Sequence, residues 1–185
     1  FSNSSNLLNV VDNNFVFNGS DYLEISANKA PQLADSDFTI EFYAKIDLNE
    51  IGEGLIYSQR LNTDPNNGLR IGYNGKNAET LWADFTGTWG QSVSIASYNN
   101  IMTHYAITFD NTSSTKLLSF YINGVFIKSY GNLDNPGNPG GGSGNLQHGT
   151  TASGKVFIGA EPEGAGYYIK SELKKLKVWN TILTS

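Results

Sequence analysis

The chain has 185 residues, no cysteine, 12 lysines and arginines, and a formal net charge of −5. Its length suits one domain of ordinary size, and the missing cysteines exclude disulfides, thiolate metal sites and a cysteine nucleophile. We expect no nucleic-acid partner, because so few cations release few counterions from a phosphate backbone. We also expect no membrane insertion, because no apolar run approaches the roughly 20 residues of a spanning helix.

Short runs rich in β-branched and aromatic residues recur along the chain, separated by Gly, Asn, Asp and Pro. Apolar residues that alternate with polar ones are typical of strands with one buried face. The alternation is clearest in residues 37–46, where Phe38, Ile40 and Phe42 share one side. In chain order, the segments that predict strands are 16–25, 37–46, 69–76, 81–85, 92–97, 104–110, 118–130 and 155–160. About a dozen strands in one domain indicate an all-β sandwich or barrel.

The segment LSFYINGVFIKSY, residues 118–130, predicts a β-hairpin that turns at Asn123 and Gly124. Asn-Gly between two apolar runs favours a two-residue type I′ turn, which needs a positive φ at both central residues. Such a turn pairs Ile122 with Val125 and continues outward in register. The face expected to enter the core then comprises Leu118, Phe120, Ile122, Val125 and Ile127.

The opposite face of this hairpin combines aromatic and polar side chains. It carries a cross-strand pair of Tyr121 and Phe126, with Ser119 and Lys128 beside it. A cross-strand aromatic pair contributes about 0.5 to 1 kcal/mol. We expect the Gly-rich loop that follows, or a neighbouring module, to cover this pair. In the alternative interpretation, the two rings form part of a platform for a sugar.

A Gly- and Pro-rich segment spans residues 131–154. Only roughly 30 residues follow it, too few for a further domain. We therefore interpret it as a long surface loop within a single domain that covers residues 1–185. The sequence begins at Phe1 rather than at Met, which suggests a processed or excised piece of a longer protein.

The segment ELKKLKVWNTIL, residues 172–183, fits two kinds of element. A helix would place Leu173, Leu176 and Asn180 on one face, whereas a strand would place Leu176 and Val178 together with Asn180. Periodicity alone does not separate the helix from the strand.

Six segments in order resemble the laminin-G-like jelly roll of the concanavalin A-like lectin and glucanase superfamily. They are VFNGSDYLEI (16–25), DFTIEFYAKI (37–46), THYAITFD (103–110), LSFYINGV (118–125), VFIGA (156–160) and IKSELKKLKVWNTIL (169–183). The resemblance implies a jelly-roll β-sandwich of two antiparallel sheets, each with about six or seven strands. It also implies a C-terminal strand through Val178, followed by a short turn that holds Leu183.

This sequence departs from the family pattern at two places. Lys174 and Lys175 replace an aspartate pair, and Ser171 replaces a glycine. Where that aspartate helps to hold a structural calcium ion in relatives, a lysine ammonium would repel the ion. The resemblance therefore does not extend to a calcium site at this position.

The superfamily includes glycosidases, so catalysis has to be judged from the residues. A retaining glycosidase needs two carboxyl groups about 5 Å apart, and the E-x-D-x-x-E motif that supplies them in glucanase relatives is absent here. Turn chemistry explains the acidic pairs Asp35/Asp37 and Glu161/Glu163. His104 lies in a predicted strand, where a packing or hydrogen-bonding role is expected. We therefore expect no catalytic residue and no enzyme activity.

Exposed aromatic rings and amide groups are what a carbohydrate-binding surface requires, and this chain is 12% aromatic and rich in Asn. The candidate ligand contacts are Trp89 in TGTWGQ, Tyr98 in SYNN, Tyr73 before an Asn-Gly pair, and Tyr167 and Tyr168 after EGAG. Each of these rings could instead pack in the core or under a loop, because a sandwich of this size buries most of its aromatic side chains.

Oxygen donors gather at two further places on the expected rim. Asp64 and Asn66 lie in NTDPNNG, and Glu161 and Glu163 lie in EPEG. A calcium ion held by such groups could bridge to a ligand, although no fixed ligand spacing is visible. We expect no other cofactor.

These observations favour a non-catalytic carbohydrate-binding or adhesion module of a larger extracellular, cell-surface or secreted protein. Its expected partners are a glycan or cell-surface polysaccharide, and neighbouring protein modules. The alternative is a structural or interaction domain of a virion or surface filament, in which the same outer face packs on protein. A polysaccharide-degrading enzyme is the least favoured hypothesis.

Overall fold

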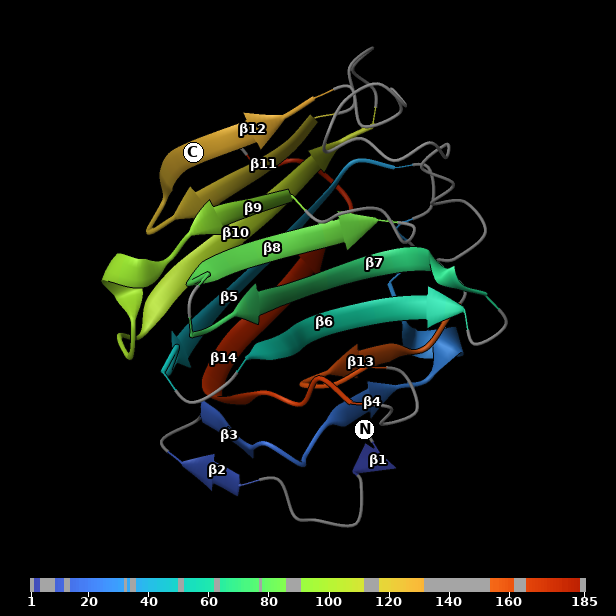
Figure 1. Ribbon diagram of the computed structural model, residues 1–185. Helices are drawn as coiled ribbons and strands as arrows, with labels where there is room; N and C mark the ends of the chain where they lie inside the picture. Colours follow the sequence, from blue (N-terminus) through green and yellow to red (C-terminus); the bar gives the residue numbers. More distant parts are fainter. Residues whose placement is uncertain are drawn as a thin grey trace.

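The chain forms two antiparallel sheets that stack face to face, as its computed structural model shows (Figure 1). The structure describes residues 2–3, 9–11, 14–31, 33, 36–49, 52–61, 64–76, 78–85, 91–111, 117–131, 154–161 and 166–183. The first sheet has the order β1 (Ser2–Asn3), β4 (Leu23–Ile25), β13 (Val156–Ile158), β6 (Glu53–Leu61), β7 (Asp64–Asn74), β8 (Thr80–Phe85) and β9 (Gln91–Ser94). The second sheet has the order β12 (Val125–Tyr130), β11 (Leu117–Ile122), β10 (Thr103–Asp110), β5 (Phe38–Ile46), β14 (Lys170–Trp179), β3 (Asn14–Asn18) and β2 (Asn9–Val11).

The segments that predict strands all contain strands, and their arrangement in two stacked sheets confirms the all-β sandwich. The segment 92–97 differs in detail, because its strand ends at Ser94 and a short 3-10 helix, η2 (Ala96–Tyr98), follows. A second 3-10 helix, η1 (Ala27–Lys29), follows β4. Strand β6 was not predicted. Its residues Leu55, Ile56 and Tyr57 are apolar in succession, and a register shift between Leu55 and Tyr57 breaks the alternation that marks the other strands.

The C-terminal segment is a strand and not a helix. β14 pairs with β5 on one side and with β3 on the other, so it is an interior strand of the second sheet. Its side chains alternate between buried and more exposed as far as Leu173. Backbone pairing to two neighbours therefore decides what periodicity left open.

The core lies between the inner faces of the two sheets and is rich in aromatic rings. Phe38 and Phe109 contact each other with ring centroids 5.4 Å apart, and Phe42 and Tyr105 do so at 5.7 Å. All four side chains are fully buried. Burial of each large apolar side chain stabilises the fold by about 1.5 to 3 kcal/mol. The inward side chains therefore hold β5 and β10 in place, and with them the residues on the opposite face of these strands.

The β11–β12 hairpin forms its turn as predicted, since φ is 51° at Asn123 and 76° at Gly124. Ile122 pairs with Val125 as expected. The register then shifts by one residue, and the predicted burial of the second strand is wrong. Val125 is 62% exposed and Ile127 is 40% exposed, because β12 is the edge strand and projects beyond the core.

The aromatic pair of this hairpin forms as predicted. Tyr121 pairs with Phe126, and their rings meet edge to face with centroids 5.6 Å apart. Phe126 is 54% exposed. Of the Gly-rich loop 131–154 that we expected to cover the pair, all but the two end residues lie outside the described residues, so this cover stays a prediction.

Candidate functional site

The outer face of the second sheet carries the candidate site. In β5 and β10 the inward side chains fill the core, so the intervening residues point outward. In register across these two strands, the outward pairs are Thr39 with Thr108, Glu41 with Ala106, and Tyr43 with His104. Strand β11 adds Tyr121 opposite Ala106, and β14 adds Lys177 opposite Glu41.

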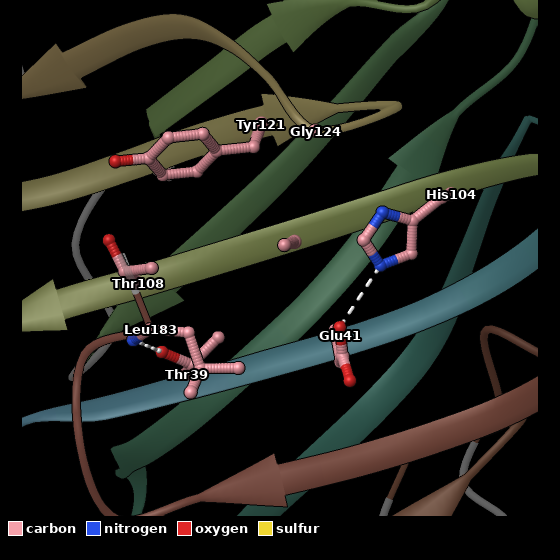
Figure 2. A pocket seen from close by; sticks show the side chains of 8 residues that line it. Thr39, Glu41, His104, Thr108, Tyr121, Gly124 and Leu183 are labelled. Atoms are coloured by element: carbon pink, nitrogen blue, oxygen red, sulfur yellow. Dashed lines mark hydrogen bonds and ion pairs between the residues drawn. The ribbon is translucent and has the colours of Figure 1, made fainter. Parts of the chain in front are cut away.

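A depression with a volume of about 210 Å³ lies on this face (Figure 2). It is lined by Thr39, Glu41, His104, Ala106, Thr108, Tyr121, Gly124 and Leu183. Ala106 lies between Tyr121 and Glu41 in the sheet, and its methyl group leaves the space that a longer side chain would fill. Figure 2 shows the rings of Tyr121 and His104 on two sides of this space, with Glu41 reaching toward His104.

Glu41 joins three donors on this face. Its Oε2 atom lies 3.1 Å from Nε2 of His104, and its Oε1 atom accepts hydrogen bonds from Nζ of Lys177 at 3.2 Å and Nε1 of Trp179 at 3.3 Å. Burial raises the pKa of Glu41, but the hydrogen bonds from Lys177, His104 and Trp179 outweigh it, so the pKa lies below its ordinary value. Glu41 is therefore a carboxylate at neutral pH.

The charge of Glu41 determines the chemistry of His104. A carboxylate only accepts hydrogen bonds, so Nε2 of His104 carries a hydrogen and donates it to Glu41. The hairpin turn fixes the backbone of the same residue. Asn123 donates its N–H to the carbonyl of His104 at 2.9 Å, and its side-chain oxygen accepts the N–H of His104 at 3.2 Å.

The other end of the depression is closed by the segment after β14. Oγ1 of Thr39 donates to the carbonyl of Thr181 at 2.8 Å and accepts the N–H of Leu183 at 3.0 Å. These two bonds hold the segment against β5, and Leu183 forms an apolar wall (Figure 2). The depression thus combines a phenol ring, an apolar wall, hydroxyl groups and one carboxylate–imidazole pair.

The outer face continues past His104 to Tyr43, whose ring centroid lies 4.8 Å from that of His104. Lys174 and Lys175 both reach this tyrosine, with Nζ atoms 5.8 Å and 5.4 Å from its ring centroid. Farther along lies a second, shallower depression of about 340 Å³. It is lined by Val16, Phe17, Asn18, Lys45, Asp47, Asn100, Lys170, Ser171 and Glu172.

The family model of the concanavalin A-like lectin/glucanases superfamily matches residues 17–185. The chain belongs to this superfamily. The resemblance of the six sequence segments is thereby confirmed. No protein of curated function matches the sequence.

Several solved structures share the fold of this superfamily member. The CBM40 module of the Ruminococcus gnavus IT-sialidase, bound to α2,3 sialyllactose, has a TM-score of 0.68 and 14% identity, over 92% of this chain and 91% of the module. The heptameric SAP-like pentraxin of Limulus polyphemus has a TM-score of 0.64 and 19% identity, over 91% of this chain and 76% of the pentraxin. A putative carbohydrate binding protein of Bacteroides ovatus has a TM-score of 0.60 and 17% identity, over 91% of this chain and 44% of that protein. At such identities these likenesses establish the fold alone.

The aromatic residues that the sequence singled out lie elsewhere in this superfamily fold. Tyr73 is fully buried in the core, so its proposed contact with a ligand is wrong, because a ring without exposed surface cannot stack on a sugar. Tyr98 is half-buried and packs against the core from η2. Tyr167 is 45% exposed. The ring of Tyr168 lies beside that of Tyr22, with their centroids 6.4 Å apart. Trp89 lies outside the described residues.

The residues proposed as calcium ligands are placed only in part. Glu163 lies outside the described residues, and of Asp64 and Asn66 only the backbone, in β7, is described. Glu161 forms an ion pair with Arg70 at 3.5 Å. A guanidinium this close disfavours a cation at the same carboxylate.

Two absences hold for the described part of the chain. No three His, Asp or Glu side chains among these residues gather closely enough to hold a metal ion. Among the same residues, no helix has the length and apolar character that crossing a bilayer requires.

Sequence reasoning missed the depression although it quoted several of its residues. Glu41 and His104 lie 63 positions apart, and only the pairing of β5 with β10 brings them together. The available signal was the polar face of segment 37–46, which suggested an exposed surface without indicating its neighbours. Tyr121 was identified as an outward aromatic residue, and its place beside Ala106 comes from the β10–β11 register.

Proposed function

We propose that this domain is a non-catalytic carbohydrate-binding module that holds a glycan on the outer face of the second sheet. The observation that carries the proposal is the depression over Ala106, between the ring of Tyr121 and the Glu41–His104 pair. An aromatic ring can stack on the apolar face of a sugar. The carboxylate of Glu41, the imidazole of His104 and the phenol of Tyr121 can accept from or donate to its hydroxyl groups.

The size of the depression indicates how much of the ligand it holds. Sites for drug-sized ligands have volumes of about 300 to 1,000 Å³. A volume of about 210 Å³ therefore suits one sugar ring, with the rest of the glycan lying along the open face of the sheet. Tyr43 and the second depression lie farther along the same face, so a longer glycan would have additional surface to contact.

The same geometry supports a binding role over hydrolysis. Glycosidases use two carboxyl groups on opposite sides of the bond that they cleave. Among the described residues that line the depression, Glu41 is the only one with a carboxyl group, and it already accepts hydrogen bonds from Lys177, Trp179 and His104. Its lowered pKa also opposes a role as a general acid.

The proposal includes the setting of the module. We infer that it belongs to a larger extracellular, cell-surface or secreted protein and serves glycan recognition or adhesion. The similar modules support this, because one of them is the CBM40 module of a sialidase and another is a pentraxin. The missing cysteines do not oppose secretion, because a domain of this length does not need disulfides.

A glycan array followed by calorimetry tests the site. We expect Tyr121→Ala to weaken binding at least about tenfold, and Ala106→Leu to abolish it by filling the depression without removing any contact of the core. The matched control is Tyr167→Ala, which removes an exposed aromatic ring outside this face. Binding that survives both site variants but falls on Trp89→Ala would contradict the proposed location. A wild-type protein that binds no neutral or acidic glycan on the array would contradict the proposed carbohydrate binding.

The second candidate function is a structural or interaction domain, and one observation favours it. Val125, Phe126 and Ile127 expose apolar surface on the edge strand β12, where the backbone can also pair with another strand. Light scattering separates the two functions. A stable oligomer that dissociates on Phe126→Lys, together with a silent array, would favour the structural role.

A further inference from the structure

A β-bulge in β14 places two lysines over one aromatic ring. Lys174 pairs with Tyr43 and Lys177 pairs with Glu41, so β14 uses one more residue than β5 over this stretch. Lys175 takes up the extra length with a φ of 52°. In a regular strand Lys174 and Lys175 would point to opposite faces, but here both Nζ atoms lie within 6 Å of the Tyr43 ring centroid.

Among the described residues, the other lysines of this face take up the nearby carboxylates. Lys45 forms an ion pair with Glu172 at 3.0 Å, and Lys177 forms one with Glu41 at 3.2 Å. Lys174 and Lys175 form none with the described residues, and ring contacts with Tyr43 are the interactions that they make there. The carboxylates of Glu41 and Glu172 are thus already compensated, and two ammonium groups remain around one tyrosine ring.

We propose that Lys174, Lys175 and Tyr43 form an anion subsite beside the depression, so that the glycan bound by this module is acidic. An anionic group beside the Tyr43 ring would be attracted by both ammonium groups and could accept charge-assisted hydrogen bonds from them. The ring of Tyr43 would carry the apolar part of the same sugar unit.

The position of the subsite makes one ligand span both places. Tyr43 packs against His104, and His104 lines the depression. A sugar ring over Ala106 would therefore have its neighbouring unit over Tyr43, within reach of the lysines. Strand β14 carries four lysines in a chain with a net charge of −5, so positive charge is concentrated where an acidic glycan would lie. The anionic group is a carboxylate or a sulfate, and the experiment distinguishes them.

The anion subsite is tested first without any glycan. Inorganic sulfate is titrated against chloride at constant ionic strength while NMR follows the lysine side-chain signals. We expect the signals of Lys174 and Lys175 to shift along a saturating curve, and those of the exposed Lys29 and Lys76 to stay unchanged. Equal shifts for all four lysines would overturn the proposal, because they would report general screening.

The class of glycan is tested with pairs of oligosaccharides that share a backbone and differ in one carboxylate or sulfate. This assignment rests on the proposed glycan binding. We expect the acidic member of the recognised pair to bind at least about tenfold more tightly than the neutral one. The double variant Lys174→Gln with Lys175→Gln should bring this ratio to within about threefold, whereas the charge-matched control Lys29→Gln with Lys76→Gln should preserve it.

The two failures are distinguishable. Neutral glycans that bind through Tyr121 with no preference for the acidic member would overturn the anion subsite and leave the proposed function standing. A saturable sulfate site in a protein that binds no glycan would overturn the proposed function and the acidic-glycan assignment with it.

Discussion

Gly72 offers a direct test of how β6, β7 and β8 pack, because a single added methyl group has no room there. A Cβ atom at this position would lie 2.6 Å from the carbonyl oxygen of Gly54 and 2.6 Å from Cζ2 of Trp82. The first contact is with the backbone of a neighbouring strand, and the second is with an indole ring that is only 6% exposed. Neither group can move away without disturbing the sheet.

The expected cost of Gly72→Ala follows from this crowding. Overpacking usually costs about 1 to 3 kcal/mol, and we expect the upper end because a strand backbone must shift. For a chain of this length, 1 kcal/mol changes Tm by about 2 to 4 °C, so Tm should fall by about 6 to 12 °C. Displacement of Trp82 should also change the tryptophan fluorescence of the folded protein.

The matched control is Gly52→Ala. An added Cβ at Gly52 meets nothing within 4 Å, and its backbone is outside the left-handed region, so Tm should stay within about 2 °C of the wild type. Scanning calorimetry and urea unfolding measure both variants. If Gly72→Ala proves as stable as Gly52→Ala, the position of the Trp82 ring over Gly72 and the register of β7 with β8 are refuted.

Three further predictions concern the turn and the charged groups. Gly124→Ala should lower the free energy of unfolding in urea by about 1 kcal/mol. The φ at this position is 76° and an added Cβ meets open space, so the cost is backbone strain alone. An unchanged free energy of unfolding would contradict the type I′ turn. Burial raises the pKa of Glu53, so its negative charge destabilises the folded state increasingly as pH rises from the pKa of the unfolded chain through that of the folded protein. In thermal unfolding, Glu53→Gln should therefore be more stable than the wild type near about pH 7 and equally stable near about pH 3. The reverse order would contradict the burial of Glu53. The pKa of Glu41 is lowered, so its carboxylate stabilises the folded protein above the pKa of the unfolded chain, and this contribution is lost as pH falls through the pKa of the folded protein. Glu41→Gln should therefore be less stable than the wild type near about pH 7, and the difference in stability should vanish in acid. A difference that does not change with pH would argue against the contacts of Glu41 with His104 and Lys177.

Some features of this protein follow from short stretches of sequence. The alternation in segment 37–46 and the Asn-Gly pair at 123–124 predict a strand and a turn that the structure contains, because both depend on residues only a few positions apart. The C-terminal strand needed the family resemblance, since its apolar spacing fits a helix equally well. β6 escaped prediction because both of its faces are covered and its register shifts.

The sequence by itself determined that the chain is all-β with one apolar face on most of its strands, because the two-residue period of a strand depends on residues close together in the chain. The choice of a sandwich over a barrel came from the family resemblance. Tertiary structure alone decided which strands are neighbours, that β12 lies at an edge with Val125 exposed, and that Tyr73 points into the core. It also brought Glu41 to His104 and turned Lys174 and Lys175 toward one ring. Strand order and bulges depend on how distant segments pack to close the core, and no short window of sequence contains that information.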